Sequence, residues 1–275
     1  MYNICKQMGV VMNNNCNIFY SEKCDGPMSG IKSFYREGIT RQEMIDDLRF
    51  RRKLLGEKYG FDGSKLIVPY QNLSLHKEGY YEDVTEMVSD ILNDNPNFDL
   101  WNLDIPCDIM LIRSSLKGVV LSYPAADCPI VIVGTKDTVA LAHCSSVCVD
   151  RELPMQIVDA VSKVGCANEK DMFAYVGPCA GGAYIYKEYP NWAKNENWKY
   201  FIEDSSDGYK IDLKGAVKAQ LTKMGLSDIY VSPIDTITDD RFYSNHAYMQ
   251  GQNEKNGRFL TGVYFPQERI KIKTR

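Results

Sequence analysis

The sequence predicts an α/β protein, a single domain over residues 1–275 in which a mixed β-sheet is flanked by helices. Three observations predict this class. Short apolar runs alternate along the chain with amphipathic segments that carry helix caps. The 275 residues are 44% hydrophobic and 25% charged, which is an ordinary globular composition. No linker-like run and no internal repeat divides the chain.

Capping residues mark the predicted helices. Thr40 and Glu43 form a capping box, so we expect a helix that begins there and ends near Gly56 or Gly60. Its basic residues are expected to form a solvated face: Arg49, Arg51, Arg52 and Lys53. Three further helices are predicted: Asp83–Leu92 with Asp83 as cap, a helix through Val164 that begins at Asp150 or nearer Leu153, and Asp212–Gly225 with Asp212 as cap.

Apolar runs bounded by turn residues predict the strands. These cover Asn17–Tyr20, Leu66–Pro69, Cys107–Leu111, Gly118–Tyr123, Ile130–Val133, Thr138–Leu141, Phe173–Gly177, Ile229–Ser232 and Gly262–Phe265. Two polar stretches between them, Asn93–Leu103 and Asn191–Asp207, are expected to be irregular surface segments.

Charge and hydropathy exclude several classes of function. The net charge is −4 and gives no basic patch for nucleic acid. No apolar run approaches the roughly 20 residues that span a bilayer, and the N-terminus lacks the apolar core of a signal peptide, so we expect a cytoplasmic protein without a membrane partner. The phosphate-binding patterns GxGxxG and GxxxxGK[ST] are absent. The nine cysteines are expected to be free thiols rather than a disulfide framework.

The stretch 124–150 joins two apolar strands by a tight turn. If Ile130–Val133 pairs antiparallel with Thr138–Leu141, Cys128 lies opposite His143 on the same sheet face. A thiolate and an imidazole at that separation can share one Zn²⁺. They can equally form a nucleophile–base pair, or be a buried cysteine beside a core histidine. The residues alone leave these three interpretations open.

Two further segments are candidate ligand-binding elements. Cys144 is expected on the opposite sheet face from His143. Cys144 and Cys148 could add metal ligands, but Cys-x₃-Cys without a second cysteine pair is a poor zinc pattern. Pro178–Gly182, which contains Cys179, predicts a turn of small residues where the backbone can approach a ligand closely.

The order of short motifs resembles the YfiH/YlmD-like family, whose members are also called polyphenol oxidase or laccase-domain proteins. The resemblance runs from about Phe19 to Phe265. The matching segments are Leu75-His76-Lys77, Ala125-Ala126-Asp127-Cys128, Ala142-His143, Val176-Gly177-Pro178-Cys179, Asp212–Gly225, Phe242-Tyr243-Ser244 and Gly257-Arg258.

The resemblance implies a YfiH-like fold and a zinc-dependent purine nucleoside enzyme. By it, His76, Cys128 and His143 would be the zinc ligands, with a fourth position open for water. The implied reactions are phosphorolysis of adenosine, inosine or guanosine and deamination of adenosine. The implied partners are a purine nucleoside and, for phosphorolysis, phosphate. Arg258 matches the family's late Gly-Arg and would contact phosphate or substrate.

The sequence departs from the family pattern at two places. The Gly-Trp-Arg-Gly that follows Ala-His in the family is replaced by Cys144-Ser-Ser-Val-Cys148, which removes an arginine suited to phosphate. His246 stands where the family tends to carry arginine, and is either a general acid/base or a loop residue without a role.

Three functions follow as alternatives. The first is the zinc-dependent nucleoside enzyme, and the second is a cysteine hydrolase with Cys128 as nucleophile and His143 as base. The third is a catalytically impaired relative that keeps the metal for structure or ligand binding. A copper oxidase is disfavoured, because three histidines cannot supply several copper sites.

Overall fold

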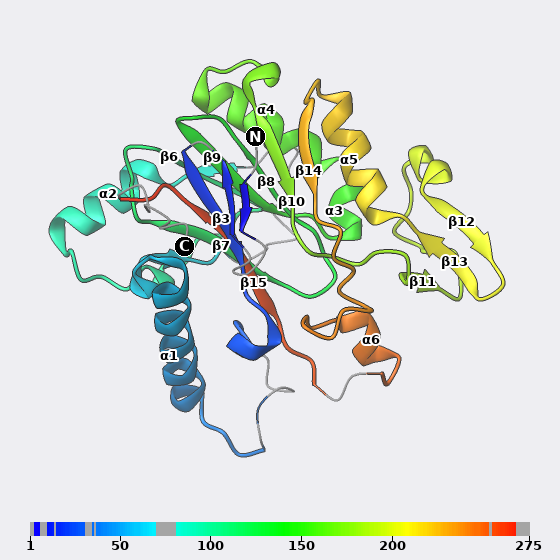
Figure 1. The fold of residues 1–275 in the computed structure, drawn as a ribbon, viewed down its shortest axis with the longest axis horizontal. Coiled ribbons are helices and arrows are strands. Elements are labelled where there is room, and N and C mark those ends of the chain that lie inside the picture. Colours follow the sequence, from blue (N-terminus) through cyan, green and yellow to red (C-terminus); the bar gives the residue numbers. More distant parts are fainter. Residues whose placement is uncertain are drawn as a thin grey trace.

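A computed structural model describes residues 3–5, 10–13, 15–30, 35, 37–69, 81–252 and 255–267 (Figure 1). Two mixed six-stranded sheets form its centre, and a smaller three-stranded sheet extends from one side. The predicted α/β class with mixed sheets and flanking helices is therefore confirmed, although the strands are divided among separate sheets. No helix within the described ranges is long and apolar enough to cross a bilayer.

The first sheet has the strand order β1-β2-β3-β15-β7-β4. All its neighbouring strands are antiparallel except β4, which runs parallel to β7. Its strands are β1 (Asn3–Cys5), β2 (Val10–Asn13), β3 (Cys16–Tyr20), β15 (Phe259–Tyr264), β7 (Val120–Ala125) and β4 (Leu66–Ile67). The C-terminal strand β15 therefore lies at the centre of a sheet that otherwise comes from the first half of the chain.

The second sheet has the order β14-β10-β8-β9-β6-β5. Its outer pairs, β10 with β14 and β6 with β5, are parallel, and its inner pairs are antiparallel. Its strands are β14 (Asp228–Val231), β10 (Phe173–Val176), β8 (Ile130–Gly134), β9 (Thr138–His143), β6 (Ile109–Arg113) and β5 (Tyr81–Asp83).

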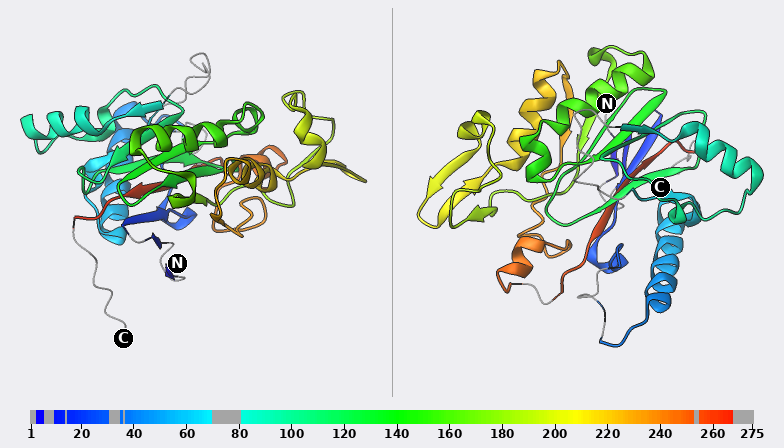
Figure 2. Two further views of the ribbon diagram at one scale, coloured as in Figure 1. Left: turned by 90° about the horizontal axis from the view of Figure 1, so that it is seen from above. Right: turned by 180° about the vertical axis from the view of Figure 1, so that it is seen from behind.

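Three apolar clusters hold the layers together. The first lies between the two sheets and joins side chains such as Leu121 and Val263 of the first sheet to Ile132 and Leu141 of the second. A second cluster lies between the second sheet and helices α4 (Leu153–Gly165) and α5 (Leu213–Lys223). A third packs α1 (Arg41–Tyr59) on the other face of the first sheet. Figure 2 shows the resulting helix–sheet–sheet–helix layering.

Helix α1 begins and ends as the sequence predicts. The side chain of Thr40 accepts a hydrogen bond from the backbone of Glu43, whose carboxylate accepts one in return. Gly60 ends the helix in the left-handed conformation, with φ of 80°.

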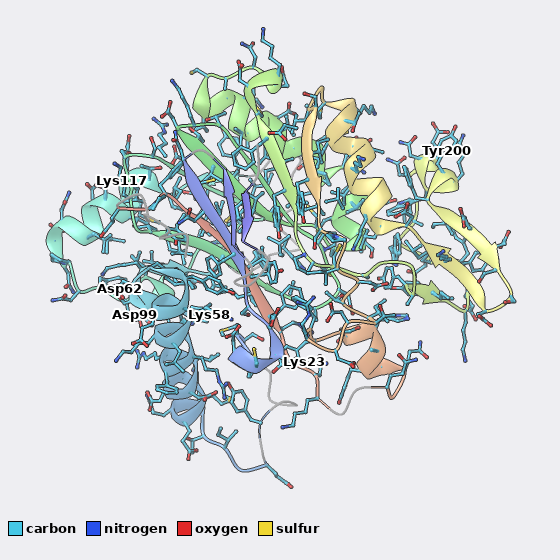
Figure 3. The ribbon with its side chains drawn as sticks, in the orientation of Figure 1. Lys23, Lys58, Asp62, Asp99, Lys117 and Tyr200 are labelled. Carbon is cyan, nitrogen blue, oxygen red and sulfur yellow. The ribbon has the colours of Figure 1, made fainter. Side chains whose placement is uncertain are left out.

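The prediction of a solvated basic face on α1 is wrong for Arg52. Its side chain is only 3% exposed, donates to both carboxylate oxygens of Asp99 and lies over the ring of Trp101, 4.2 Å from the ring centroid. Figure 3 marks Asp99 beside this helix. The planar guanidinium suits a paired and stacked position, which helical spacing alone does not reveal.

The remaining helices follow the predicted caps with two changes. Asp83 accepts from the backbone of Thr85, as expected of a capping residue, but α2 (Thr85–Asp94) starts two residues later. The region after His143 forms two helices, α3 (Ser146–Asp150) and α4, so Asp150 ends the first instead of capping the second. The alternative start near Leu153 is the correct one. A short last helix, α6 (Asn245–Met249), was not predicted.

The two segments expected to be irregular contain the 3-10 helices η4 (Leu100–Asn102) and η6 (Glu196–Tyr200). Three further 3-10 helices lie elsewhere: η1 (Lys23–Asp25), η3 (Gly63–Lys65) and η5 (Glu169–Asp171). The third sheet has the order β11-β13-β12, with β11 (Ile185–Tyr186), β12 (Ile202–Ser205) and β13 (Gly208–Ile211). It extends away from the main body in Figures 1 and 2. Leu100 and Trp198 are buried, so the prediction of surface segments is wrong at these residues.

The central hairpin is confirmed, but its register differs by two residues from the prediction. His143 pairs with Ile130, not with Cys128. The strands extend further towards the turn because Gly134 stays in β8, where the ring of Phe173 covers it. The backbone of Thr135 then donates to Thr138 and closes a shorter loop. Since a shift of two residues preserves the alternation of faces, His143 still points into the space between the sheets.

Candidate functional site

Cys128 lies in the short connection between β7 and β8, where the chain crosses from the first sheet to the second. Part of the residue is accessible, but protein surrounds the thiol, and this burial raises its pKa to about 12. The neighbouring Asp127 adds to the rise, whereas the positive charge of Arg258 opposes it. Without a compensating cation the thiol is therefore neutral.

His143 ends β9 on the face that points towards the first sheet. Its imidazole stacks on the ring of Tyr123 in β7, with centroids 4.7 Å apart and an angle of 16° between the planes. Burial, together with the positive charge of Arg258, lowers the pKa of His143 to about 4. The ring is consequently neutral at physiological pH, which is the form that binds metals.

Arg258 immediately precedes the central strand β15. Its guanidinium donates to the side chain of Asn256 at 2.6 Å and to the carbonyl of Gly257 at 2.8 Å. Its charge acts on the pKa of both Cys128 and His143. Burial lowers the pKa of Arg258 itself, while Cys128 and Asp127 raise it. The structure therefore brings a predicted anion-binding cation close to two of the three predicted metal ligands, Cys128 and His143.

Asp127 connects this group of residues to the C-terminal third of the chain. Its carboxylate accepts from the hydroxyl of Thr236 at 2.8 Å and from the backbone N–H of His246 at 2.7 Å. Its carbonyl accepts from the backbone of Ala180. Asp127 has φ of 78°, in the left-handed region that aspartate tolerates better than most residues. The sequence placed Asp127 in a motif but assigned it no role.

His246 lies in α6 beside this network. Its ring meets Tyr184 edge-on, with centroids 5.3 Å apart, and lies 6.1 Å from the ring of Tyr186. The hydroxyls of Ser146, Tyr184 and Tyr186 form a hydrogen-bonded chain with distances of 3.2 and 2.7 Å. His246 thus lies in a short helix close to Asp127, and its acid/base role remains a prediction.

The small-residue turn after β10 is held by Asp235. The carboxylate of Asp235 accepts from the backbone N–H groups of Gly181 and Ala183. Cys179 forms a backbone bridge with the same residue. The N–H groups of Gly181 and Ala183 are therefore already paired with Asp235.

The remaining cysteines of this region pack in the core. Cys144, Cys148 and Cys179 are buried in the cluster between the second sheet and the helices, so Cys144 lies on the face opposite to His143, as predicted. Ser145 caps α3 and its hydroxyl donates to the sulfur of Cys148 at 3.0 Å. The cysteines whose side chains the structure describes form no disulfide.

His76, the third predicted metal ligand, lies outside the described residues. Within the described ranges, no three histidine, cysteine or acidic side chains are grouped so that they could hold a metal. Cys128 and His143 supply two donor types that zinc accepts in proteins. No sequence motif points to Tyr123; its hydroxyl is buried and has no hydrogen-bond partner among the described atoms.

The raised pKa of Cys128 weighs against the cysteine hydrolase. A nucleophilic cysteine needs a lowered pKa and a base within hydrogen-bond reach. At Cys128 the pKa is raised, and the facing residue of His143 is Ile130.

A model of the family described as multi-copper polyphenol oxidoreductase laccase matches residues 63–266. The chain belongs to this family. The match includes Cys128, His143, His246 and Arg258. A purine nucleoside phosphorylase of Campylobacter jejuni is 27% identical over 165 residues, which cover 58% of this chain and 68% of that protein.

Solved structures of low sequence identity share the fold. YfiH of Bacillus licheniformis has a TM-score of 0.70 and 17% identity, covering 96% of this chain and 98% of that chain. YlmD of Geobacillus stearothermophilus has a TM-score of 0.67 and 20% identity, covering 94% and 93%. This laccase-family chain therefore has a YfiH/YlmD-like fold over nearly its whole length, which confirms the predicted family.

Proposed function

We propose that this laccase-family protein is a zinc-dependent purine nucleoside enzyme that phosphorolyses adenosine-type nucleosides, deaminates adenosine, or does both. The observation that carries the proposal is the convergence of Arg258 on Cys128 and His143. Arg258, a cation suited to an anion, acts electrostatically on Cys128 and His143, the two described residues of the proposed metal site. The relative named purine nucleoside phosphorylase supports the same substrate class.

Zinc would be held by Cys128, His143 and, by resemblance, His76. When bound, Zn²⁺ supplies a Lewis acid and lowers the pKa of a water ligand towards 7. The neutral imidazole of His143 needs no deprotonation before it binds a metal. The buried thiol of Cys128 requires a cation in order to ionise.

The chain's own residues have separable tasks in this proposal. Arg258 binds the attacking phosphate or the substrate, and Asn256 fixes its orientation. His246 transfers a proton to or from the substrate, with its ring oriented by Tyr184. Tyr123 fixes the plane of the His143 ring.

A catalytically impaired relative is the second candidate. The segment after His143 forms α3, in which Ser145 is a cap and Cys148 is buried. The arginine that the family carries in this segment has no counterpart there, and Arg151 at the end of α3 is exposed. Phosphate recognition would then depend on Arg258.

Metal content and turnover test the proposal together. Protein purified without chelator should carry about one zinc per chain, and Cys128→Ala and His143→Ala should lose it. Cys166→Ala, a change at an exposed cysteine, is the matched control and should keep the metal. Adenosine should be consumed, with products distinguishing phosphorolysis from deamination. Zinc without turnover on a purine nucleoside panel would favour the impaired relative, and wild-type protein without zinc would refute the metal site.

A further inference from the structure

Three hydroxyl groups form a hydrogen-bonded chain beside His246. The chain begins at Ser146 in α3, passes through Tyr184 and ends at Tyr186 in β11, with oxygen–oxygen distances of 3.2 and 2.7 Å. Ser146 and Tyr184 are 8% and 9% exposed, whereas Tyr186 is half-buried. The chain therefore connects the core to a phenol that a ligand can reach.

This hydroxyl chain has a preferred direction. Its three O–H groups share two hydrogen bonds, so one O–H points out of the chain. Among the described residues, Tyr184 is the only partner of the Ser146 hydroxyl, so a chain that ran towards Ser146 would leave a buried O–H without an acceptor. In the opposite direction Ser146 donates to Tyr184, Tyr184 donates to Tyr186, and the O–H of Tyr186 remains to donate outward. Burial raises the pKa of Tyr184, so its phenol stays a protonated donor at neutral pH.

Backbone pairing fixes the two tyrosines on one side of β11. The backbone of Ile211 donates to the carbonyl of Tyr184 at 2.9 Å, and Tyr186 pairs with Tyr209 of the neighbouring strand β13. Residues two apart on a strand face the same way. The rings of Tyr184 and Tyr186 accordingly both lie near that of His246 on α6, the helix beside β11 in Figure 1.

The outward O–H of Tyr186 lies among aromatic rings close to the proposed reaction site. The centroid of its ring is 6.1 Å from that of His246 and 6.1 Å from that of Trp192. His246 is in turn held through its backbone N–H by Asp127, the residue before Cys128. A donor set among aromatic rings suits a flat heteroaromatic group that carries a hydrogen-bond acceptor.

The groups of this hydroxyl chain are neutral, and its buried end lies in the segment 144–148, where the family pattern has an arginine. The segment therefore offers a ligand a hydrogen-bond donor, through Tyr186, instead of a positive charge. The ring nitrogens N3 and N7 are neutral acceptors that adenosine, inosine and guanosine share. A substrate of the proposed class thus carries the acceptor that matches the last donor of the chain.

We infer that Tyr186 is a specificity-determining residue whose hydroxyl donates to N3 or N7 of the purine, and that Ser146 is a positioning residue that acts through Tyr184. The inference rests on the proposed nucleoside function and deepens it, because it assigns recognition of the base to residues that hold neither metal nor phosphate. Donation along the chain strengthens the last donor, since successive hydrogen bonds polarise one another.

Inosine in phosphate-free buffer tests the inference at equilibrium, because neither phosphorolysis nor deamination consumes it there. The 3-deaza and 7-deaza forms of inosine each replace one acceptor nitrogen by C–H. Calorimetry on protein purified without chelator should show that one of the two analogues binds roughly tenfold more weakly than inosine, as expected when a donor loses its acceptor. Tyr186→Phe should bind inosine roughly tenfold more weakly than the wild type does, and should bind inosine and that analogue equally.

Matched variants separate this contact from packing. Tyr189→Phe removes an exposed phenol of the same connection that is not part of the chain, and should keep the preference for inosine. Ser146→Ala should lose part of the preference, and Ser146→Thr, which keeps the hydroxyl, should restore it.

Equal binding of inosine and both analogues by the wild type, or an unchanged preference in Tyr186→Phe, would overturn the inference and leave the proposed function intact. An unchanged preference in Ser146→Ala would overturn the positioning role of Ser146. Failure of the wild type to bind inosine would refute the proposed function and the inference with it.

Discussion

At the scale of single residues, Asp127 links the segment that carries Cys128 to the segment that carries His246. One carboxylate holds the hydroxyl of Thr236 and the backbone of His246, more than a hundred residues away in sequence. Its left-handed backbone turns the chain so that Cys128 follows at the entrance to β8. The position therefore needs a side chain that both accepts hydrogen bonds and tolerates positive φ.

Asp127→Ala should lower the free energy of unfolding by about 2–4 kcal/mol, because two donors lose their acceptor and alanine is strained at this φ. Asp127→Asn keeps an acceptor and the tolerance of positive φ, and should cost less than half as much. Urea unfolding at neutral pH measures both. Equal losses for the two variants would contradict the assigned hydrogen-bonding role.

Arg258→Gln should raise the KM for phosphate roughly 10- to 100-fold, since a charge-assisted hydrogen bond contributes about 1.5–3 kcal/mol. Arg258→Lys should lie between the wild type and this variant, because lysine keeps the charge but not the planar fork. Initial rates of adenosine consumption at varied phosphate concentration measure the effect. An unchanged KM in Arg258→Gln would remove Arg258 from phosphate binding.

At the scale of elements, α1 shows that one residue of a charged helix face can be buried while its neighbours are exposed. Arg49, Arg51, Arg52 and Lys53 have similar sequence surroundings, yet only Arg52 among them is buried and lies over Trp101. Arg49 also reaches Asp99, at 3.5 Å, but its side chain is 47% exposed. The difference arises from η4, which presents its acidic cap, Asp99, to this side of the helix.

Arg52→Ala should destabilise the fold by about 2–4 kcal/mol, because it removes a buried ion pair and exposes the ring of Trp101. Lys53→Ala, at the exposed next position, should change stability by less than about 0.5 kcal/mol. Thermal and urea unfolding of the two variants provide the comparison. Similar stabilities would show that the Arg52 contacts contribute nothing net.

At the scale of the whole molecule, ion pairs of Arg241 join distant parts of the chain. Arg241, just before α6, contacts Asp239 at 2.7 Å and Glu22, which follows β3, at 3.2 Å. Hydrogen bonds from Arg241 lower the pKa of Asp239. The carboxylate therefore stabilises the folded state above the unfolded pKa of about 3.9, and this contribution disappears as pH falls through the lower folded value.

Asp239→Asn should consequently cost stability at pH 7, but less than about 1 kcal/mol because the pair is partly exposed. The difference from wild type should shrink as the pH falls below about 4. Urea unfolding at pH 7 and at pH 3.5 tests this dependence. A difference that stays constant between these pH values would exclude the ionised pair as its cause.

Much of the layered fold could be predicted from the sequence, because the signals involved are local. The cap of α1 at Thr40, that of α5 at Asp212 and the buried strands β8 and β9 depend on neighbouring residues alone. The register of the central hairpin could not be predicted, because Phe173 of another strand covers Gly134. The division of the strands into two sheets could not be predicted either, because it depends on pairing between strands that are far apart in the sequence.

The candidate site likewise combines residues that local motifs predict with residues that only distant contacts reveal. Short motifs identified Cys128, His143, His246 and Arg258, and the structure brings these four to one region. The roles of Tyr123 and Asp127 depend on contacts across the sheets, and no local pattern reveals them. His76 remains a prediction.

The central position of β15 also bears on how the protein is made. The first sheet joins β3 to β7 only through a strand that begins at Phe259, and Arg258 directly precedes it. A nascent chain on the ribosome therefore holds two unjoined halves of this sheet until Phe259–Tyr264 has emerged. Since domains generally fold as units during synthesis, the complete site should form only after this strand is available.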